Sequence, residues 1–413
     1  MISFLPKKEN FQFLIIVCLS IFFSLLSIFS HKIIILEFGS NNFELYSAII
    51  TISLILSNFF MFGTRSTYLL LRENMDDLKS YFITSSFLVV ILSTVSSGIL
   101  YFFLIPLLES NNFKQNFNLF FFFILSQSII LLMSNYWNAL RKSILSKLVI
   151  FVPGLIFFAM LTNHLNDNFI TSLSNSYLIT AILFLPVLIK DLYPISFENI
   201  SFKHIINNLS SSISFMNSNL IDVFTNRLSV LFFIYIVVDL HNMALFSIAL
   251  SISRLSMLGV NTLNYVFSPK IADEIKLPTN NISIISKNMR LIAFLISIFL
   301  FFLFFLIGKE IIQYFYTELY LEAYLLILIM LFGQIINSIF NPIPVVAKLS
   351  GYAQRISIYK FILTIIMFIC NYSLYDKFGI NLIAFNYILF IYVLWNLSIY
   401  FMLKNFRAHS SIG

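Results

Sequence analysis

The sequence predicts an all-α integral membrane protein with about 12 transmembrane helices in two lobes of six, around a central cavity. The first observation behind this prediction is composition: of 413 residues, 59% are hydrophobic and only 10% are charged, with a mean hydropathy of +0.93. A soluble domain carries about 25% charged residues, because water must solvate its surface. A chain with less than half that share has lipid as its main solvent.

The second observation is the length of the apolar segments. A membrane-spanning helix needs about 20 apolar residues, whereas the strands of a transmembrane barrel alternate apolar and polar positions. Runs such as 11–36 and 291–307 are continuously apolar, which favours helices. We expect spans at 11–35, 42–63, 80–106, 117–139, 147–163, 170–189, 213–237, 242–266, 288–308, 321–347, 357–375 and 379–403.

The third observation is the placement of positive charge. If the N-terminus is cytoplasmic, 19 of the 25 Lys and Arg residues fall on inside segments and four on outside segments. The inside group includes Lys348 and Arg355, between the tenth and eleventh spans, and Lys360, at the inner edge of the eleventh. Cytoplasmic loops favour Lys and Arg, so this alternation supports twelve spans with both termini inside. The net charge of +7 therefore reflects membrane topology. The basic residues are scattered over short loops, which argues against a basic surface that binds nucleic acid.

The chain is expected to divide into an N-lobe, 1–200 with spans one to six, and a C-lobe, 201–413 with spans seven to twelve. A hydrophilic connection around 190–212 separates them. Phe43 with Tyr46-Ser47-Ala48 in the second span has a weak counterpart in Phe246-Ser247-Ile248-Ala249 of the eighth. This pairing hints at two parallel six-helix repeats. The first span is expected to stay uncleaved, because its apolar run is too long for a signal peptide.

Polar residues recur on one face of several spans. At about 100° per residue, five spans carry such a stripe. The stripes are Ser20, Ser24, Ser27 and His31; Gln127, Ser134 and Asn138; Ser212, Asn219, Asp222 and Asn226; Ser247, Ser251, Arg254 and Asn261; and Gln334, Asn337, Ser338 and Asn341. A single stripe is explained by hydrogen bonds between neighbouring helices. Five stripes together favour a shared hydrated cavity. Tyr136, Trp137 and Tyr265, near inner ends of spans, are expected in the interfacial aromatic belt.

Three ionisable residues lie within consecutive spans. Asp222 is roughly 13 Å and Arg227 roughly 20 Å from the inner end of the seventh span, and Arg254 is near the middle of the eighth. Burying a charge at this depth costs about 2.5–3.5 kcal/mol, so each needs water, a partner or a ligand. One alternative is a structural bridge from Asp222 to Arg254 or Arg227. The other is an anionic ligand such as a phosphate, because two Arg outnumber one Asp. Arg65, after Gly63-Thr64, is expected at the cavity mouth or as a topology residue.

Signatures of catalysis and of nucleotide use are missing. The sequence contains no GxxxxGK[ST] loop, no HExxH and no GxSxG. We therefore expect a protein that is not an enzyme, holds no cofactor or catalytic metal, and draws on ions, membrane potential or a substrate gradient.

Several passages resemble the Wzx-type polysaccharide flippases of the multidrug/oligosaccharidyl-lipid/polysaccharide (MOP) exporter superfamily. They are Leu36-Glu37-Phe38-Gly39 with Phe43-Glu44-Leu45-Tyr46-Ser47; Asp222 with Leu245-Phe246-Ser247-Ile248-Ala249, Arg254 and Ser268-Pro269-Lys270-Ile271-Ala272; and the approach from Tyr320 to Gln334 and Gly351. The resemblance covers most of the chain. It departs at Phe38 and Glu44, where those flippases usually have Leu and Gly.

The resemblance implies a MATE-like fold that moves a polyprenyl-diphosphate-linked oligosaccharide, such as an O-antigen repeat unit, across a bacterial inner membrane by alternating access. Arg227 and Arg254 would attract the diphosphate, and Asp222 would tune them or carry a coupling proton. Asn219, Asn226, Asn261, Gln334 and Asn337 would bind sugar hydroxyls. Lipid tails would stay in the bilayer, and a glycan polymerase and a chain-length regulator are conceivable partners.

Two other functions remain open from the sequence. A MATE-like exporter of small molecules or cations would favour an acidic cavity with aromatic faces. A membrane glycan polymerase would show a large outside loop, and no outside loop here exceeds about 15 residues.

Overall fold

The computed structural model describes residues 7–61, 64–104, 117–163, 168–193, 220–237, 239, 241–256, 264, 271 and 282–410, and regular structure in these ranges is helical. Contacts divide the chain into two compact units, Leu14–Leu220 and Ile221–Gly413, and the second also takes in the first thirteen residues. The boundary expected at residues 200 and 201 lies outside the described residues.

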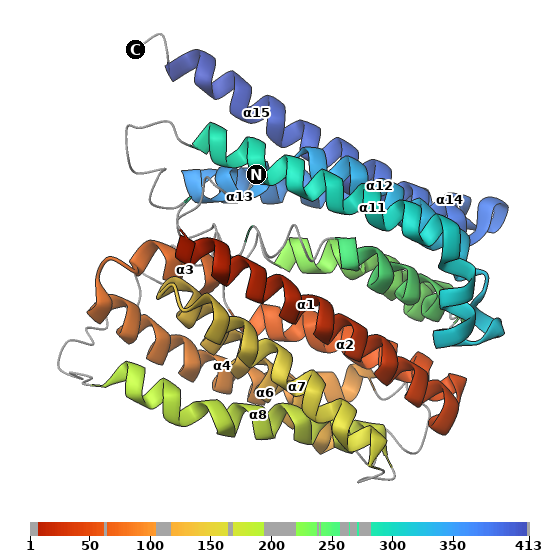
Figure 1. Cartoon of the computed structure of the whole chain (residues 1–413), viewed down its shortest axis with the longest axis horizontal. Helices are drawn as coiled ribbons and strands as arrows, with labels where there is room; N and C mark the ends of the chain where they lie inside the picture. The colour runs from red at the N-terminus through yellow and green to blue at the C-terminus, as the bar shows by residue number, and fades with distance from the viewer. Residues whose placement is uncertain are drawn as a thin grey trace. The chain divides into compact units, whose positions relative to one another are not determined.

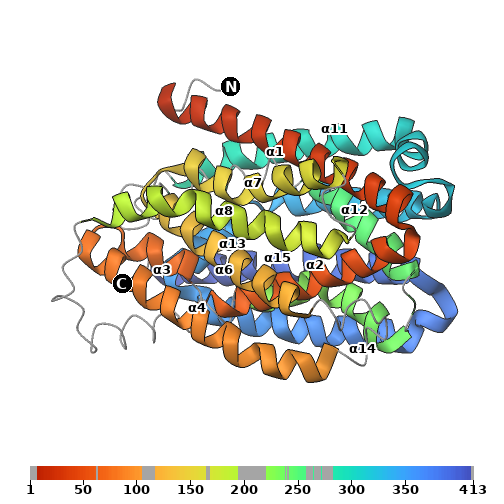
Figure 2. The ribbon, with the colours of Figure 1, turned by 90° about the horizontal axis from the view of Figure 1, so that it is seen from below.

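The first unit is built from long apolar helices that pack side by side. Its central helix, α6, lies between α4 and α8 and contacts both (Figure 2), while α7 packs on α6 and α8. The elements are α1 (Lys7–Ile33), the π-helical turn η1 (Ile34–Phe38), α2 (Ser40–Phe60), α3 (Thr64–Leu71), α4 (Met75–Leu104), α6 (Phe117–Ala139), α7 (Ser143–Thr162) and α8 (Phe169–Leu192).

Two features of this unit differ from the predicted spans. The segment after the second span forms a separate short helix, α3, which the hydropathy pattern did not indicate. The fifth span, predicted at 147–163, is a 20-residue helix with Pro153 inside it. An interior proline lacks an N–H donor, but neighbouring helices make it tolerable in a membrane helix.

The second unit begins with helices at 220–232 and 241–256. In Figure 1 the following helices α11 and α12 run alongside each other, and they share many contacts. The elements are η4 (Phe233–Val237), α11 (Ile282–Tyr316), η5 (Glu318–Tyr320), α12 (Ala323–Ile339), α13 (Ile343–Ala347), η6 (Lys348–Tyr352), α14 (Ala353–Tyr387), η7 (Ile388–Leu394) and α15 (Trp395–Ser410).

The long element α14 folds back on itself at Gly379. This residue has φ 64° and ψ −157°, a conformation available mainly to glycine. Nδ2 of Asn386 donates to Oδ1 of Asn371 at 2.8 Å. Fifteen residues on a straight helix would separate these positions by about 22 Å. The reversal therefore separates the predicted eleventh and twelfth spans.

The predicted tenth span, 321–347, is wrong in its second half. The helix ends at Ile339, and a short helix, α13, starts at Ile343. Pro342 and Pro344 cause the break, because a proline inside a helix removes a hydrogen-bond donor and clashes with the preceding turn. Pro344 is accommodated in the first turn of α13, where its missing donor is not needed.

The helix surfaces fit a lipid solvent. Phe299, Phe302 and Leu306 on α11 are more than half exposed, whereas Ala293 and Ser297 on the same helix are buried. Among the described residues, seven helical stretches are long and apolar enough to cross a membrane, and one of them, Ile343–Leu403, runs through 61 residues. The chain is therefore a multi-pass, all-helical membrane protein, as predicted.

Candidate functional site

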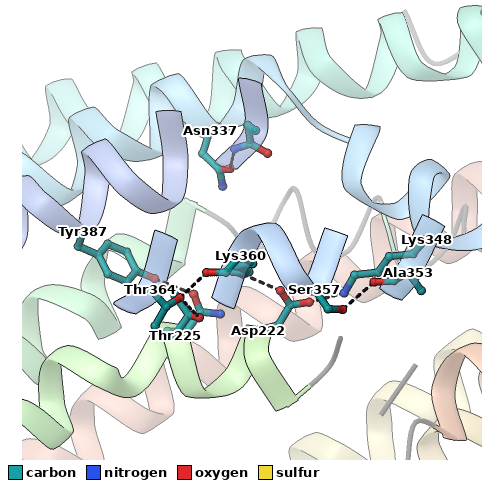
Figure 3. A network of polar contacts seen from close by, with 11 residues as sticks. Asp222, Thr225, Asn337, Lys348, Ala353, Ser357, Lys360, Thr364 and Tyr387 are labelled. Atoms are coloured by element: carbon teal, nitrogen blue, oxygen red, sulfur yellow. Dashed lines mark hydrogen bonds and ion pairs between the residues drawn. The ribbon is translucent and has the colours of Figure 1, made fainter. Parts of the chain in front are cut away.

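An ionic cluster lies within the second unit (Figure 3). Nζ of Lys360 on α14 is 2.6 Å from Oδ1 of Asp222, and Nζ of Lys348 in η6 contacts Oδ2 of the same carboxylate. The side chains of Asp222, Lys348 and Lys360 are 26%, 15% and 5% exposed. Buried charges are stable only when paired, and here one carboxylate bridges two ammonium groups.

The helix at 220–232 and α14 meet along their polar faces. Ser357, Lys360, Thr364 and Asn371 are spaced by three, four and seven residues, which places them on one face of α14, and all four are buried. Next to the ion pair, the hydroxyls of Thr225 and Thr364 lie 2.7 Å apart, and Thr364 donates to the carbonyl of Lys360 at 2.7 Å. The ion pair thus belongs to a continuous hydrogen-bonded seam.

A second set of polar contacts surrounds Tyr387 and Tyr392. The Tyr387 hydroxyl donates to Oδ1 of Asn226 at 2.8 Å, and the two tyrosine rings lie edge to face with centroids 5.2 Å apart. Nε2 of Gln334 on α12 donates to the hydroxyl of Tyr392. Three helical segments of the second unit are joined at this point.

A series of hydrogen-bonded amide side chains, which we call the amide chain, starts at Gln334. Nδ2 of Asn337 donates to Oε1 of Gln334 at 3.3 Å, and Nδ2 of Asn396 donates to Oδ1 of Asn337 at 2.9 Å. Side chains of this type donate and accept, as sugar hydroxyls require of a binding surface. The amide chain therefore extends the site with side chains that each offer a hydrogen-bond donor and an acceptor.

The two arginines are close to the tyrosines. Tyr387 interacts electrostatically with Arg254, Arg227 and Asp222. Arg254 also interacts with Tyr392. Together with the two lysines, the described residues of the cluster include four cationic side chains and one carboxylate, an excess of positive charge among them.

The structure brings six of the nine predicted site residues into this network. They are Asp222, Asn226, Arg227, Arg254, Gln334 and Asn337. Asn219 and Asn261 lie outside the described residues. Arg65 lies in the first turn of α3, in the first unit, and its side chain is also outside the described part.

The predicted ionic partner of Asp222 is wrong. One of the two alternatives from the sequence was a bridge to Arg254 or Arg227, but the carboxylate pairs with Lys348 and Lys360. The charge map had placed both lysines on the inner surface, because they flank a predicted loop. The spacing of Lys360 with Ser357, Thr364 and Asn371 was a signal in the sequence that it lies on a buried helix face.

The polar stripe of the fourth span has a local explanation. Oγ of Ser57 donates to Oε1 of Gln127 at 3.0 Å, which joins α2 to α6. The hydroxyls of Ser134 and Ser146 lie 3.0 Å apart and join α6 to α7. In the described part of the first unit, Gln127 and Ser134 therefore hold helices together, as the simpler interpretation of a polar stripe expected.

The interfacial aromatic belt predicted for Tyr136 and Trp137 is also wrong, and Tyr265 lies outside the described residues. The side chains of Tyr136 and Trp137 are fully buried, and Nε1 of Trp137 donates to Oδ2 of Asp191 at 2.9 Å. Lys142 binds the other oxygen of this carboxylate at 2.6 Å. Trp137 therefore links the C-terminal end of α6 to α8.

Comparison with known proteins gives structural but not sequence relatives. No family model matches the chain, and no curated protein matches it. The fold is similar to a crystal structure of a mutant of the Vibrio cholerae MATE transporter VcmN, with a TM-score of 0.73, 10% identity, and 97% of this chain and 98% of that chain covered.

Two further solved structures have the same fold. The eukaryotic MATE transporter AtDTX14 matches with a TM-score of 0.67 and 11% identity over 96% of each chain. The lipid II flippase MurJ, in an inward closed conformation, matches with a TM-score of 0.61 and 15% identity, covering 95% of this chain and 87% of that chain. The chain therefore has the fold shared by MATE transporters and MurJ, and the MATE-like fold class predicted from the sequence is confirmed.

Proposed function

We propose that the protein is a flippase that carries polyprenyl-diphosphate-linked oligosaccharide repeat units across a bacterial inner membrane by alternating access. The observation that carries this proposal is the positive cluster in the second unit, where four cationic side chains accompany one carboxylate. A diphosphate carries several negative charges, so it suits such a site better than a neutral or cationic molecule does. The fold supports the proposal, because one of its structural neighbours is described as a lipid II flippase.

The amide residues beside the charges give the second part of the site. Gln334, Asn337 and Asn226 would hydrogen-bond sugar hydroxyls, while Arg227 and Arg254 would attract the diphosphate. We propose Asn219, Asn261 and Arg65 as further contacts. The two lobes, spans one to six and seven to twelve, would enclose the cargo, with both termini cytoplasmic. A glycan polymerase and a chain-length regulator would receive it on the outer side.

A cation exporter with the same fold is the second candidate. Its cargo would need acidic groups and aromatic faces in the cavity. The charge balance around Tyr387 favours an anion instead. A polymerase is further disfavoured, because the structural neighbours named above are described as transporters or as a flippase.

Deletion of the gene followed by lipid analysis tests the proposal. A strain without the flippase should accumulate complete single repeat units, still linked to the lipid, on the inner leaflet. Loss of a polymerase would instead leave exported single units at the surface. Restoration by the wild-type gene, but not by the Arg254→Ala variant, would assign the defect to this site, and normal surface polysaccharide in the deletion strain would overturn the proposal.

A further inference from the structure

We propose that Asp222 is an internal competitor of the substrate: its carboxylate occupies the place between Lys348 and Lys360 that a phosphate of the cargo takes when the site is loaded. This inference rests on the proposed function, because it defines how the same site would bind a diphosphate. The shared chemistry is that of an oxyanion with at least two oxygens, one for each ammonium group.

The contacts of Asp222 are those of a replaceable ligand. Each carboxylate oxygen contacts one lysine, and the described residues supply it with no other hydrogen bond or ion pair. An ionised carboxylate offers about four acceptor positions, so a permanently structural one in a protein interior usually gains further donors. The side chain is also 26% exposed, so it is not fully enclosed by the protein.

Lys360 is held in place by a contact that does not depend on Asp222. Nζ of Lys360 lies 4.2 Å from the centroid of the Trp395 ring. Trp395 itself packs in a hydrophobic cluster with Ile343, Ala347 and Ile399. If Asp222 turns away, Lys360 therefore keeps its position, and two neighbouring ammonium groups are left to attract another anion.

A donor without a partner lies on the same aromatic ring. The indole N–H of Trp395 is buried and has no hydrogen-bond acceptor within the described part of the chain. Buried polar groups of this kind are uncommon in native proteins. A phosphate has more acceptor oxygens than a carboxylate, so it would bring an acceptor into the neighbourhood of this donor while it neutralises both lysines.

Competition predicts a specific effect of removing the carboxylate charge. While Asp222 occupies the lysine pair, only a fraction of the molecules is competent to bind, and the apparent affinity is lowered by that fraction. The Asp222→Asn variant should therefore bind an oxyanion more tightly than the wild type. A residue that only stabilised the site would show the opposite, because its loss would disorder the lysines.

The chain offers a built-in reporter for this experiment. It has two tryptophans, so Trp137→Phe leaves Trp395, beside Lys360, as the single source of tryptophan emission. The full-length protein in lipid nanodiscs is titrated with inorganic pyrophosphate and, separately, with a polyprenyl diphosphate that carries no sugar. We expect a saturable change in emission, and about tenfold tighter binding in Asp222→Asn, which is within the usual range of coupling between two ligands.

Matched variants separate competition from disruption. Lys360→Gln should lose the response. Asp239→Asn makes the same chemical change in the same unit, at a carboxylate that binds Asn242 and not the lysines, and should leave the affinity unchanged. If Asp222→Asn does not fold, Lys348→Gln replaces it and should weaken pyrophosphate binding.

The outcomes are distinguishable from failure of the proposed function. Equal or weaker pyrophosphate binding by folded Asp222→Asn, or wild-type binding by Lys348→Gln, overturns the inference even if glycan export depends on the protein. Tighter binding in Asp222→Asn supports it even in a protein that exports no glycan. A response to both probes shows that the diphosphate group suffices, and a response to the lipid alone, with the same dependence on Asp222, shows that the lipid chain is also required.

Discussion

The ammonium group of Lys360 lies 4.2 Å from the centre of the Trp395 ring. Its other contact, at 2.6 Å, is the carboxylate of Asp222. The cation is thus held between an aromatic face and an anion, two attractions that reinforce each other away from water. Because the three residues belong to α14, α15 and the helix at 220–232, this arrangement joins distant segments of the second unit.

Removal of the Asp222 carboxylate should destabilise the protein. The Asp222→Ala variant leaves two buried ammonium groups without their anion, and breaking a buried pair in this way costs about 3–5 kcal/mol. Thermal unfolding of the purified protein in detergent measures the loss. Asp376→Ala, at an exposed carboxylate on α14, should change stability by no more than about 0.5 kcal/mol. Equal melting temperatures of the two variants would show that the Asp222 carboxylate does not stabilise the protein.

Loss of the Lys360 charge should partly rescue an Asp222 variant. The double variant Asp222→Leu with Lys360→Met replaces the ion pair by apolar groups, which is often neutral or stabilising. It should unfold at a higher temperature than Asp222→Leu alone, with Lys348 still in place. A double-variant cycle measures the coupling between the two residues, and additive losses would contradict a direct pair.

Arg254→Ala should abolish export of the lipid-linked glycan while the protein stays in the membrane. Its guanidinium lies in the positive cluster, within electrostatic reach of Tyr387 and Tyr392. Surface polysaccharide and membrane protein level are measured together in a deletion strain that carries each variant. Arg355→Ala is the control, because Arg355 is an exposed residue whose guanidinium lies 6.0 Å from the ring of Tyr352. Full export by Arg254→Ala would remove this residue from the site.

Tyr387→Phe should weaken the link between the ionic cluster and the amide chain. The variant loses the hydrogen bond to Asn226, a contact worth about 0.5–1.5 kcal/mol, and leaves an amide oxygen without its donor. We expect a small fall in melting temperature and a larger fall in export. Tyr372→Phe, on the exposed side of α14, should have neither effect. Equal behaviour of the two variants would show that the Tyr387 hydroxyl has no special role.

Gly333→Ala should disturb the contact between α12 and η7. A Cβ atom at this position would lie 2.5 Å from Cγ1 of Ile388 and 2.9 Å from Cδ2 of Tyr392, so the ring that binds Gln334 must shift. Overpacking of this kind costs about 1–3 kcal/mol. Gly154→Ala is the matched control, because no atom lies within 4 Å of its Cβ and the helix should gain about 0.5–1 kcal/mol. A stable, active Gly333→Ala protein would refute the tight contact.

The helices were predictable because the tendency to enter lipid is a local property of the sequence. Each apolar run of about 20 residues identifies a helix without knowledge of its neighbours. Helix breaks caused by a single residue type are also predictable from the sequence. The prolines after Ile339 are an example, although the predicted span 321–347 ignored them. A short polar helix such as α3 has no comparable signal, since eight residues are too few for a clear periodicity.

The sequence by itself determined the helical membrane fold, the polar face with Asp222 and Asn226 on one helix, and the polar face with Arg254 on the next. Only the tertiary structure decided that Asp222 pairs with Lys348 and Lys360, residues more than 120 positions away. The physical reason is that periodicity defines which side of a helix is polar, but not which other helix packs against that side. The choice of partner follows from helix packing over the whole unit, because a buried charge must bind the opposite charge that packing brings within reach.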